Sequence, residues 1–313
     1  MWTPLLWTLA LSVSVLGVSA PAGLLTSAET PARAHSGVSL EADTIQAGDS
    51  MQEIRLVDGS VIYARVIAVS GEEVTAETAG GVRLVLARSQ ISSARTARGE
   101  VVDGRFWRAD PNHTRLFFAP TARPLRRGEG YAANYMLFFP FVGYGVTERF
   151  SMAGGTPVLP SFMGEVLYLA PKVTVASRAG MDFAVGGLAL FATSELDEGS
   201  IGIVYGAGTF GDVQRSLSAG VGWGFTLLGD HSSISNDPVF MLGGDLRIGE
   251  STKLLTENWF VVGSGDAGGI AAAGLRMFGE RLSADLGLGM GVGSGSMECC
   301  LPIVNFVYMF GNR

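Results

Sequence analysis

The sequence predicts an all-β chain in which an antiparallel transmembrane β-barrel of ten or twelve strands follows a small five-stranded β-module. Three observations support this prediction. The chain has 44 glycines, and only 16% of its residues are charged, whereas about a quarter are charged in a typical soluble domain. From residue 131 onward, strand-like runs alternate apolar with small polar side chains. After residue 20, no apolar run approaches the roughly 20 residues that a transmembrane helix needs.

The first 34 residues are expected to be a secretory signal peptide. The run from Trp2 to Ala20 is apolar and uncharged, and the small residues around its end allow cleavage after Ala20 or after Ala34. An uncleaved membrane anchor is the alternative, because no basic residue precedes the run and the first one is Arg33. Residues 35–51 show no periodicity and are expected to form a linker.

Residues 52–96 are expected to form the five-stranded module. Short β-rich runs are separated there by the turn pairs Asp58-Gly59, Ser70-Gly71 and Gly80-Gly81, and such pairs between alternating apolar residues are strong hairpin signals. In size and strand spacing the segment resembles small SH3-like or Sm-like barrels.

An arginine-rich connector is expected over residues 97–130. Residues 82–130 contain ten arginines and four acids, whereas residues 131–313 have a net charge of −7. One interpretation is a docking surface for an anionic group such as a lipid phosphate, and the other is a solvated strand face with a basic hinge. The connector arginines are Arg105, Arg108, Arg115, Arg123, Arg126 and Arg127.

Residues 131–313 are expected to form the barrel. In 216–227 and 282–293 the alternation is unbroken, so that Leu217 and Leu288 lie on apolar faces while Ser218 and Gly289 lie on small polar ones. A soluble barrel would carry charges on its second face, whereas a membrane barrel turns its apolar face to lipid and its polar face to the lumen. The less favoured alternative is a secreted β-sandwich with a large exposed apolar face.

Eleven candidate barrel strands can be listed from the sequence. Because bacterial barrels have an even number of strands, one of these is wrongly divided or one strand is missing, and we predict ten or twelve. Residues 115–119, Arg-Leu-Phe-Phe-Ala, are the best candidate for a missed strand. The predicted strands are 134–145, 147–155, 164–177, 180–192, 200–210, 214–228, 238–249, 252–263, 267–278, 281–293 and 301–310.

Two motifs resemble those of Gram-negative outer-membrane barrels. Residues 143–150, Gly-Tyr-Gly-Val-Thr-Glu-Arg-Phe, are similar to a hairpin turn common in that group, and Phe306, Tyr308 and Phe310 alternate as in its aromatic last strand. The resemblance implies an outer-membrane location with the module in the periplasm. The resemblance also implies outer-membrane lipid and the barrel-assembly machinery as partners. A periplasmic protein is a further candidate partner, of residues 52–96. No nucleic-acid partner is expected.

Several ionisable residues are expected to point into the lumen, because their neighbours lie on the apolar faces. Ionisable groups at membrane depth are costly unless they are paired or hydrated, so they indicate either an ion-paired interior that closes the barrel or a lined aqueous pore. We expect a narrow or closed lumen. The candidates are Lys172, Asp182, Asp245, Arg247, Glu257 and Asp285.

No enzyme, cofactor or metal site is expected. A serine–histidine–acid set could be drawn from His231 and Ser232, but Asp and Ser are common in turns. Cys299 and Cys300 are adjacent, and we expect no structural disulfide. The expected function is therefore structural or tethering, with a narrow diffusion or transport channel and a lipid-modifying enzyme as alternatives.

Overall fold

The structure, a computed structural model, describes residues 45–159, 165–192, 199–229, 231–263, 268–293 and 296–311. The expected signal peptide and the expected linker up to residue 44 lie outside these ranges. The described chain forms a five-stranded sheet, a two-stranded hairpin and a closed barrel. Within these ranges, no helix is long and apolar enough to cross a membrane.

The N-terminal sheet is antiparallel, in the order β4-β3-β2-β1-β5. Gly59 and Gly71 have φ angles of 88° and 57°, a region that glycine enters at low cost, and this places the tight turns at the predicted pairs. The buried core consists of Ile54, Ala64, Val66, Val74, Ala76 and Ala94. The strands are β1 (Met51–Leu56), β2 (Val61–Ser70), β3 (Glu73–Thr78), β4 (Arg83–Ala87) and β5 (Ile91–Thr96).

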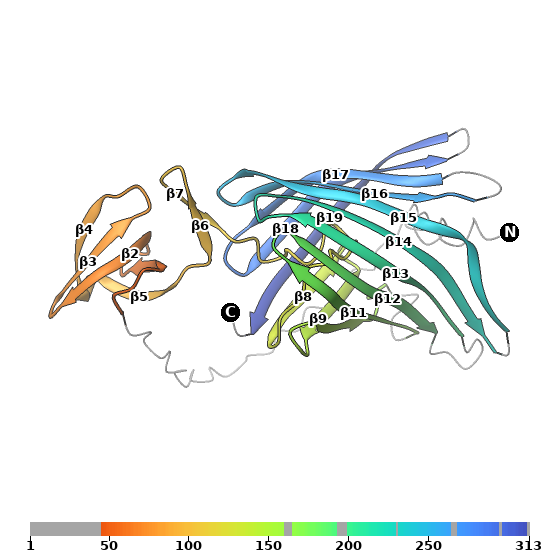
Figure 1. Cartoon of the computed structure of the whole chain (residues 1–313), viewed down its shortest axis with the longest axis horizontal. Coiled ribbons are helices and arrows are strands. Elements are labelled where there is room, and N and C mark those ends of the chain that lie inside the picture. The colour runs from red at the N-terminus through yellow and green to blue at the C-terminus, as the bar shows by residue number, and fades with distance from the viewer. Residues whose placement is uncertain are drawn as a thin grey trace, which may run out of the picture. The chain divides into compact units, whose positions relative to one another are not determined.

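The barrel has twelve antiparallel strands, in agreement with the larger of the two predicted numbers (Figure 1). Each strand pairs with the next along the chain, and pairing of β19 with β8, from Asn305 opposite Tyr135 to Gly311 opposite Glu129, closes it. The strands are β8 (Glu129–Tyr135), β9 (Phe139–Gly145), β10 (Phe150–Gly155), β11 (Val166–Arg178), β12 (Met181–Ala192), β13 (Gly199–Gly211), β14 (Arg215–Leu228), β15 (His231–Gly249), β16 (Thr252–Val261), β17 (Gly268–Phe278), β18 (Leu282–Gly293) and β19 (Ser296–Gly311).

The strand missing from the prediction is β8, most of which precedes the predicted run 134–145. That run covers the last two residues of β8, the turn after it and the whole of β9. β8 ends at Tyr135, and Met136 and Leu137 have φ angles of 52° and 65°, so the chain reverses there before β9. The candidate run 115–119 is not a barrel strand, and its only pairing is an isolated bridge between Arg115 and Pro120. The expectation that these residues supply the missing strand is wrong.

The predicted alternation appears in the structure as an exposed and a buried face. On β14, Leu217 and Leu227 are exposed while Ser216 and Ser218 are buried. On β18, Leu286 and Leu288 are exposed while Ser283 and Asp285 are buried. Because neighbouring strands repeat this pattern around the barrel, large apolar side chains cover its outer wall and polar ones face the lumen.

The two ends of the barrel differ in their connections. At one end, called here the short-turn end, the strands are joined by residues 146–149, 179–180, 212–214, 250–251 and 279–281. The first and last residues of the barrel, Glu129 and Gly311, lie at this same end, because they pair with each other. Connections at the other end, called the far end, include 156–165 and 193–198.

Candidate functional site

The predicted connector contains a hairpin followed by a segment that runs inside the barrel. β6 (Gly99–Val102) pairs with β7 (Arg105–Arg108). Residues 109–125, called here the plug, lie between β7 and β8 and contain no regular strand or helix. Figure 1 shows this yellow segment running among the barrel strands. Its contacts, described next, are with residues on the inner faces of those strands.

Apolar contacts place the turn of the plug against the inner wall. Phe117 is fully buried and clusters with Leu255 on β16, Ala272 on β17 and Ile303 on β19. Gly287 on β18 provides the room, because a Cβ at that position would lie only 3.0 Å from the Phe117 ring. The plug residues Leu116 and Ala119 pack in the same way on Met241 of β15.

Arg276 on β17 is the main polar link between the wall and the plug. It is fully buried, and its Nε and Nη2 atoms donate to Asp285 Oδ1 and Oδ2 at 2.7 and 2.9 Å. The remaining donors reach plug carbonyls: Nη1 donates to Asn112 O at 2.7 Å and Arg115 O at 3.0 Å, and Nη2 to Leu116 O at 2.8 Å. A guanidinium has five N–H donors in a fixed plane, so this side chain fixes the path of the plug backbone.

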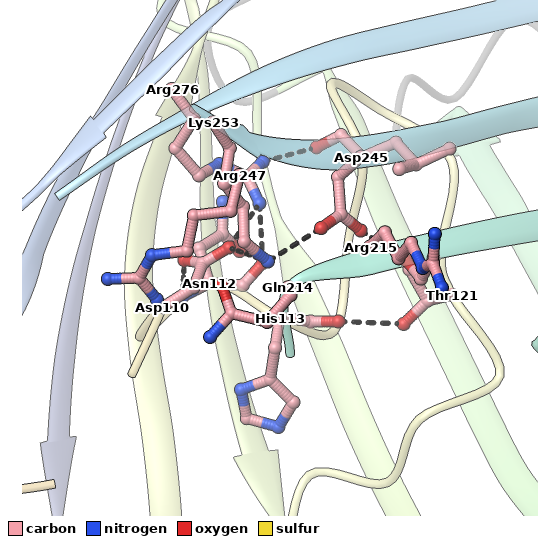
Figure 2. A network of polar contacts seen from close by, with 12 residues as sticks. Asp110, Asn112, His113, Thr121, Gln214, Arg215, Asp245, Arg247, Lys253 and Arg276 are labelled. Carbon is pink, nitrogen blue, oxygen red and sulfur yellow. Dashed lines mark hydrogen bonds and ion pairs between the residues drawn. The ribbon is translucent and has the colours of Figure 1, made fainter. Parts of the chain in front are cut away.

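Asp110 brings a plug carboxylate into the same cluster (Figure 2). Its Oδ2 lies 3.3 Å from Arg276 Nη1 and 3.3 Å from Lys253 Nζ. Lys253 also pairs with Asp245 on β15, with 2.6 Å between Nζ and Oδ1. Burial by itself would raise the pKa of Asp110, but Arg276, Lys253, the N–H group of Asn112 and His113 together outweigh it and hold that pKa well below its ordinary value. Asp110 is therefore ionised at neutral pH.

Two further wall residues bind the backbone of the plug turn. The Oε2 atom of Glu257 accepts hydrogen bonds from Phe118 N at 2.9 Å and Ala119 N at 3.0 Å, while Oε1 accepts from Trp259 Nε1. Asn305 on β19 donates from Nδ2 to Phe117 O at 3.0 Å. Both side chains are buried. They form hydrogen bonds with plug N–H and C=O groups that would otherwise be costly to bury.

The opposite wall binds the second half of the plug. Lys172 on β11 donates from Nζ to Thr121 O at 3.0 Å and Arg123 O at 2.8 Å. Ala122 is bound on both sides, because Thr174 Oγ1 donates to its carbonyl and its N–H donates to Thr209 Oγ1, each at 2.9 Å. The plug is thus hydrogen-bonded to strands on both sides of the lumen.

Most of the predicted lumen residues lie on the inner face of the wall. Asp245 and Asp285 join the Arg276 cluster, and Asp182 instead lies half-exposed at the short-turn end, beside Ser177. Arg247 is buried, but within the described chain it pairs with neither Asp245 nor Asp285. Its Nε donates to Gly249 O at 3.0 Å. Lys172 and Glu257 bind the plug, as given above.

Sequence reasoning missed Lys253, Arg276 and Asn305. Arg276 could have been found, because Leu275 and Met277 on either side of it are exposed apolar residues, and strand alternation then points Arg276 inward. Lys253 was harder to find, because its inward-facing neighbour Leu255 is apolar and hides the alternation.

The connector arginines do not form one surface. Arg105, Arg126 and Arg127 are exposed, and Arg108 lies over the Tyr63 ring of β2, 5.0 Å from its centroid. Arg115 and Arg123 belong to the plug, and Arg123 Nη2 donates to Asp212 O at 2.6 Å. The interpretation of a single solvated face or hinge is therefore wrong for these two arginines.

Within the described chain, no group of three or more His, Cys, Asp or Glu residues is placed to hold a metal ion. The side chain of His231 lies outside the described residues, so the set drawn from His231 and Ser232 stays untested. Cys300 is disulfide-bonded, and the expectation of no disulfide is wrong.

Comparison with known proteins gives likenesses to solved structures alone. No family model matches the chain, and no curated protein matches it. Among solved structures, a loop-deletion mutant of OmpT, an outer membrane protein of Vibrio cholerae, has 13% identity and a TM-score of 0.39, covering 83% of this chain and 96% of that one. A KdgM porin in complex with oligogalacturonate has 10% identity and a TM-score of 0.39, covering 58% and 98%. OccK11 (OpdR) of Pseudomonas aeruginosa has 13% identity and a TM-score of 0.33, covering 84% and 94%.

Proposed function

We propose that the chain is a non-enzymatic outer-membrane barrel that is closed by its own plug and that anchors the five-stranded module at the membrane. The observation that carries the proposal is the bonding of Arg276, which connects β17 and β18 to three plug carbonyls. The plug, bound in this way and with Phe117 packed on the inner wall, occupies the space through which a solute would pass.

The apolar outer wall supports the membrane location. Residues such as Leu217 on β14, Phe240 on β15 and Leu288 on β18 are exposed on the outer wall, and an apolar face of this extent is favourable against lipid and unfavourable against water. Short turns in outer-membrane barrels face the periplasm. Asp110, at the start of the plug, pairs with Lys253 and Arg276, which lie beside the short turns 250–251 and 279–281. The chain therefore enters the lumen from the short-turn end, and we propose that the module, which precedes the plug, lies in the periplasm.

A gated channel is the second candidate, and the wall behind the plug favours it. Lys172, Glu257, Arg276, Asp285 and Asn305 line that wall. If the plug moved, these groups would face water, as they do in an aqueous pore. The plug is linked to the wall by hydrogen bonds and ion pairs, which can exchange with water, so a partner that withdrew it would open a polar path.

Two measurements on the purified membrane-fraction protein test the proposal. A mobility shift between boiled and unboiled samples on a detergent gel is expected for a folded membrane barrel, and recovery in the soluble fraction with no shift would overturn the proposal. In planar bilayers, the wild-type chain is expected to give no steady conductance steps, whereas a variant in which a Gly-Ser linker replaces residues 110–121 is expected to give them. Steady large steps from the wild type would favour the channel over the closed barrel.

A further inference from the structure

Arg115, in the plug, has an unusual set of neighbours. Its guanidinium lies over the rings of Tyr131, Tyr135 and Phe141, with centroids 5.5, 5.8 and 5.7 Å from Cζ. Nε and Nη2 donate to Tyr131 Oη at 3.2 and 2.8 Å, and Nη1 donates to Phe118 O at 3.3 Å. We call Arg115 and these four aromatic residues the Arg115 site.

The site has a positive charge with no acid beside it. Among the residues that the structure describes, no carboxylate oxygen lies within 4.0 Å of the Arg115 nitrogens. Three hydrogen bonds use three of the five N–H donors of a guanidinium, which leaves two donors. The acids Asp110, Asp245 and Asp285 cluster instead with Arg276 and Lys253. The buried acid Glu257 accepts hydrogen bonds from the N–H groups of the plug turn.

A second observation at the site is independent of the first. The hydroxyl of Tyr135 is buried and has no hydrogen-bond partner. An unsatisfied buried hydroxyl is costly, and each such group in a folded protein needs an explanation, of which a missing bound group is one. A ligand oxygen that reaches Arg115 next to the Tyr135 ring would be close to this hydroxyl as well.

The site is accessible, unlike the rest of the plug turn. Phe118 keeps 37% of its surface exposed, although its neighbour Phe117 is fully buried, and Arg115 is itself only partly buried. The Phe118 ring lies 6.2 Å from that of Tyr135, the last residue of β8 before the turn to β9 at the far end. The exposed ring of Phe118 therefore lies near the far-end turn between β8 and β9.

We propose that the Arg115 site binds a small organic oxyanion, a carboxylate or phosphate attached to a flat apolar body. Arg115 and the Tyr135 hydroxyl would donate to the oxyanion, and the exposed ring of Phe118 would contact the body. Free donors beside a positive charge select an anion over a cation, and the aromatic ring favours a flat partner. The proposal goes beyond the closed barrel, because it requires the lumen to be open only at the far end.

Titration calorimetry of the full-length barrel in a non-ionic detergent, at constant ionic strength, tests the proposal. The probes are benzoate, inorganic phosphate and uncharged benzyl alcohol. Benzoate is expected to bind saturably, and its affinity is expected to fall by about tenfold or more in Arg115→Gln and by about threefold to tenfold in Tyr135→Phe, which keeps the ring. Phosphate is expected to bind more weakly than benzoate and to lose binding in Arg115→Gln.

Arg105→Gln is the matched control, because it removes an exposed arginine of the same connector, and it is expected to bind benzoate as the wild type does. Heat modifiability of each variant checks its folding, and Tyr135→Phe keeps the test valid if Arg115→Gln does not fold. The proposal is overturned if benzoate shows no saturable binding, if folded Arg115→Gln and Tyr135→Phe bind it unchanged, or if benzyl alcohol binds as tightly as benzoate. Any of these results would leave Arg115 as a structural contact of the plug and would not affect the closed-barrel proposal.

Discussion

Arg276 and Asp285 stand directly opposite each other on the hairpin of β17 and β18, and their buried side chains form two parallel hydrogen bonds of 2.7 and 2.9 Å. The same guanidinium reaches three carbonyls of the plug. The hairpin of β17 and β18 therefore provides both a buried bidentate ion pair and the main attachment of the plug.

Arg276→Ala is expected to lower the free energy of unfolding by about 3–5 kcal/mol, because it leaves Asp285 buried without its cation and Asp110 with Lys253 alone. Urea unfolding in lipid vesicles, followed by tryptophan fluorescence, measures the change. Arg105→Ala, at an exposed side chain, is the control and is expected to cost less than about 0.5 kcal/mol. Equal stability of the two variants would show that the Arg276 cluster is not formed.

The adjacent residues Phe117 and Phe118 make a matched pair. Phe117→Ala is expected to destabilise the barrel by about 3–5 kcal/mol, since it empties a packed position between β16, β17 and β19. Phe118→Ala removes a ring that is 37% exposed and is expected to cost much less. The same unfolding experiment compares the two variants. A lower stability of Phe118→Ala than of Phe117→Ala would mean that Phe118, and not Phe117, packs on the inner wall.

Acid is expected to weaken the attachment of the plug through Asp110. Because the folded-state pKa of this group is lower than the ordinary value of 3.8, its contribution to stability is fully present above that value and is lost as pH falls through the lowered one. The charged groups of the cluster that face it are Lys253, Arg276, Arg247, His113, Asp245 and Asp285.

The difference between the wild type and Asp110→Asn isolates this group from the other acids. The variant is expected to be less stable than the wild type at pH 7, and the gap is expected to begin to narrow below about pH 4 and to go on narrowing as pH falls further. Unfolding curves for both proteins from pH 7 down to about pH 2 measure the gap. A gap that stays constant over this range would mean that Asp110 does not contribute through its charge.

Leu288 and Val57 are both exposed apolar residues, at 55% and 68%, but the first lies on the barrel wall and the second in the turn between β1 and β2 of the N-terminal module. Leu288→Arg is expected to cost about 2–4 kcal/mol in a bilayer, as arginine does near the midplane of a barrel. Val57→Arg is expected to have little effect. Folding yield and urea unfolding in vesicles of both variants test whether the barrel wall faces lipid.

The barrel was predictable from the sequence because its strands follow a period of two. Ser218 and Leu217 lie on the faces that the alternation assigns to them, and the strand limits mostly agree within two or three residues. The count failed at Tyr135 and Phe139, because the turn between them consists of Met136, Leu137 and Phe138, three apolar residues that continue the pattern of a strand.

The plug was not predictable in the same way. Residues 109–125 have no period, and Leu116 and Phe117 have the composition of a strand although their contacts are with the lumen wall. Their position depends on Arg276, Glu257 and Asn305, which are 138 or more residues distant in the chain. Strand alternation indicates which side chains point inward, but it contains no information about what they meet there.

Hydrogen–deuterium exchange at the plug turn tests the central claim, that residues 109–125 lie bonded inside the barrel, most directly. The N–H groups of Phe118 and Ala119 donate to buried Glu257, and that of Ala122 donates to Thr209. In the folded barrel in detergent, the account predicts that these amides exchange as slowly as those of β16 and β17, and that Glu257→Gln speeds exchange at Phe118 and Ala119 but not in the strands. Exchange of all three amides at the rate of an unstructured peptide, in a barrel whose strands are protected, would contradict it.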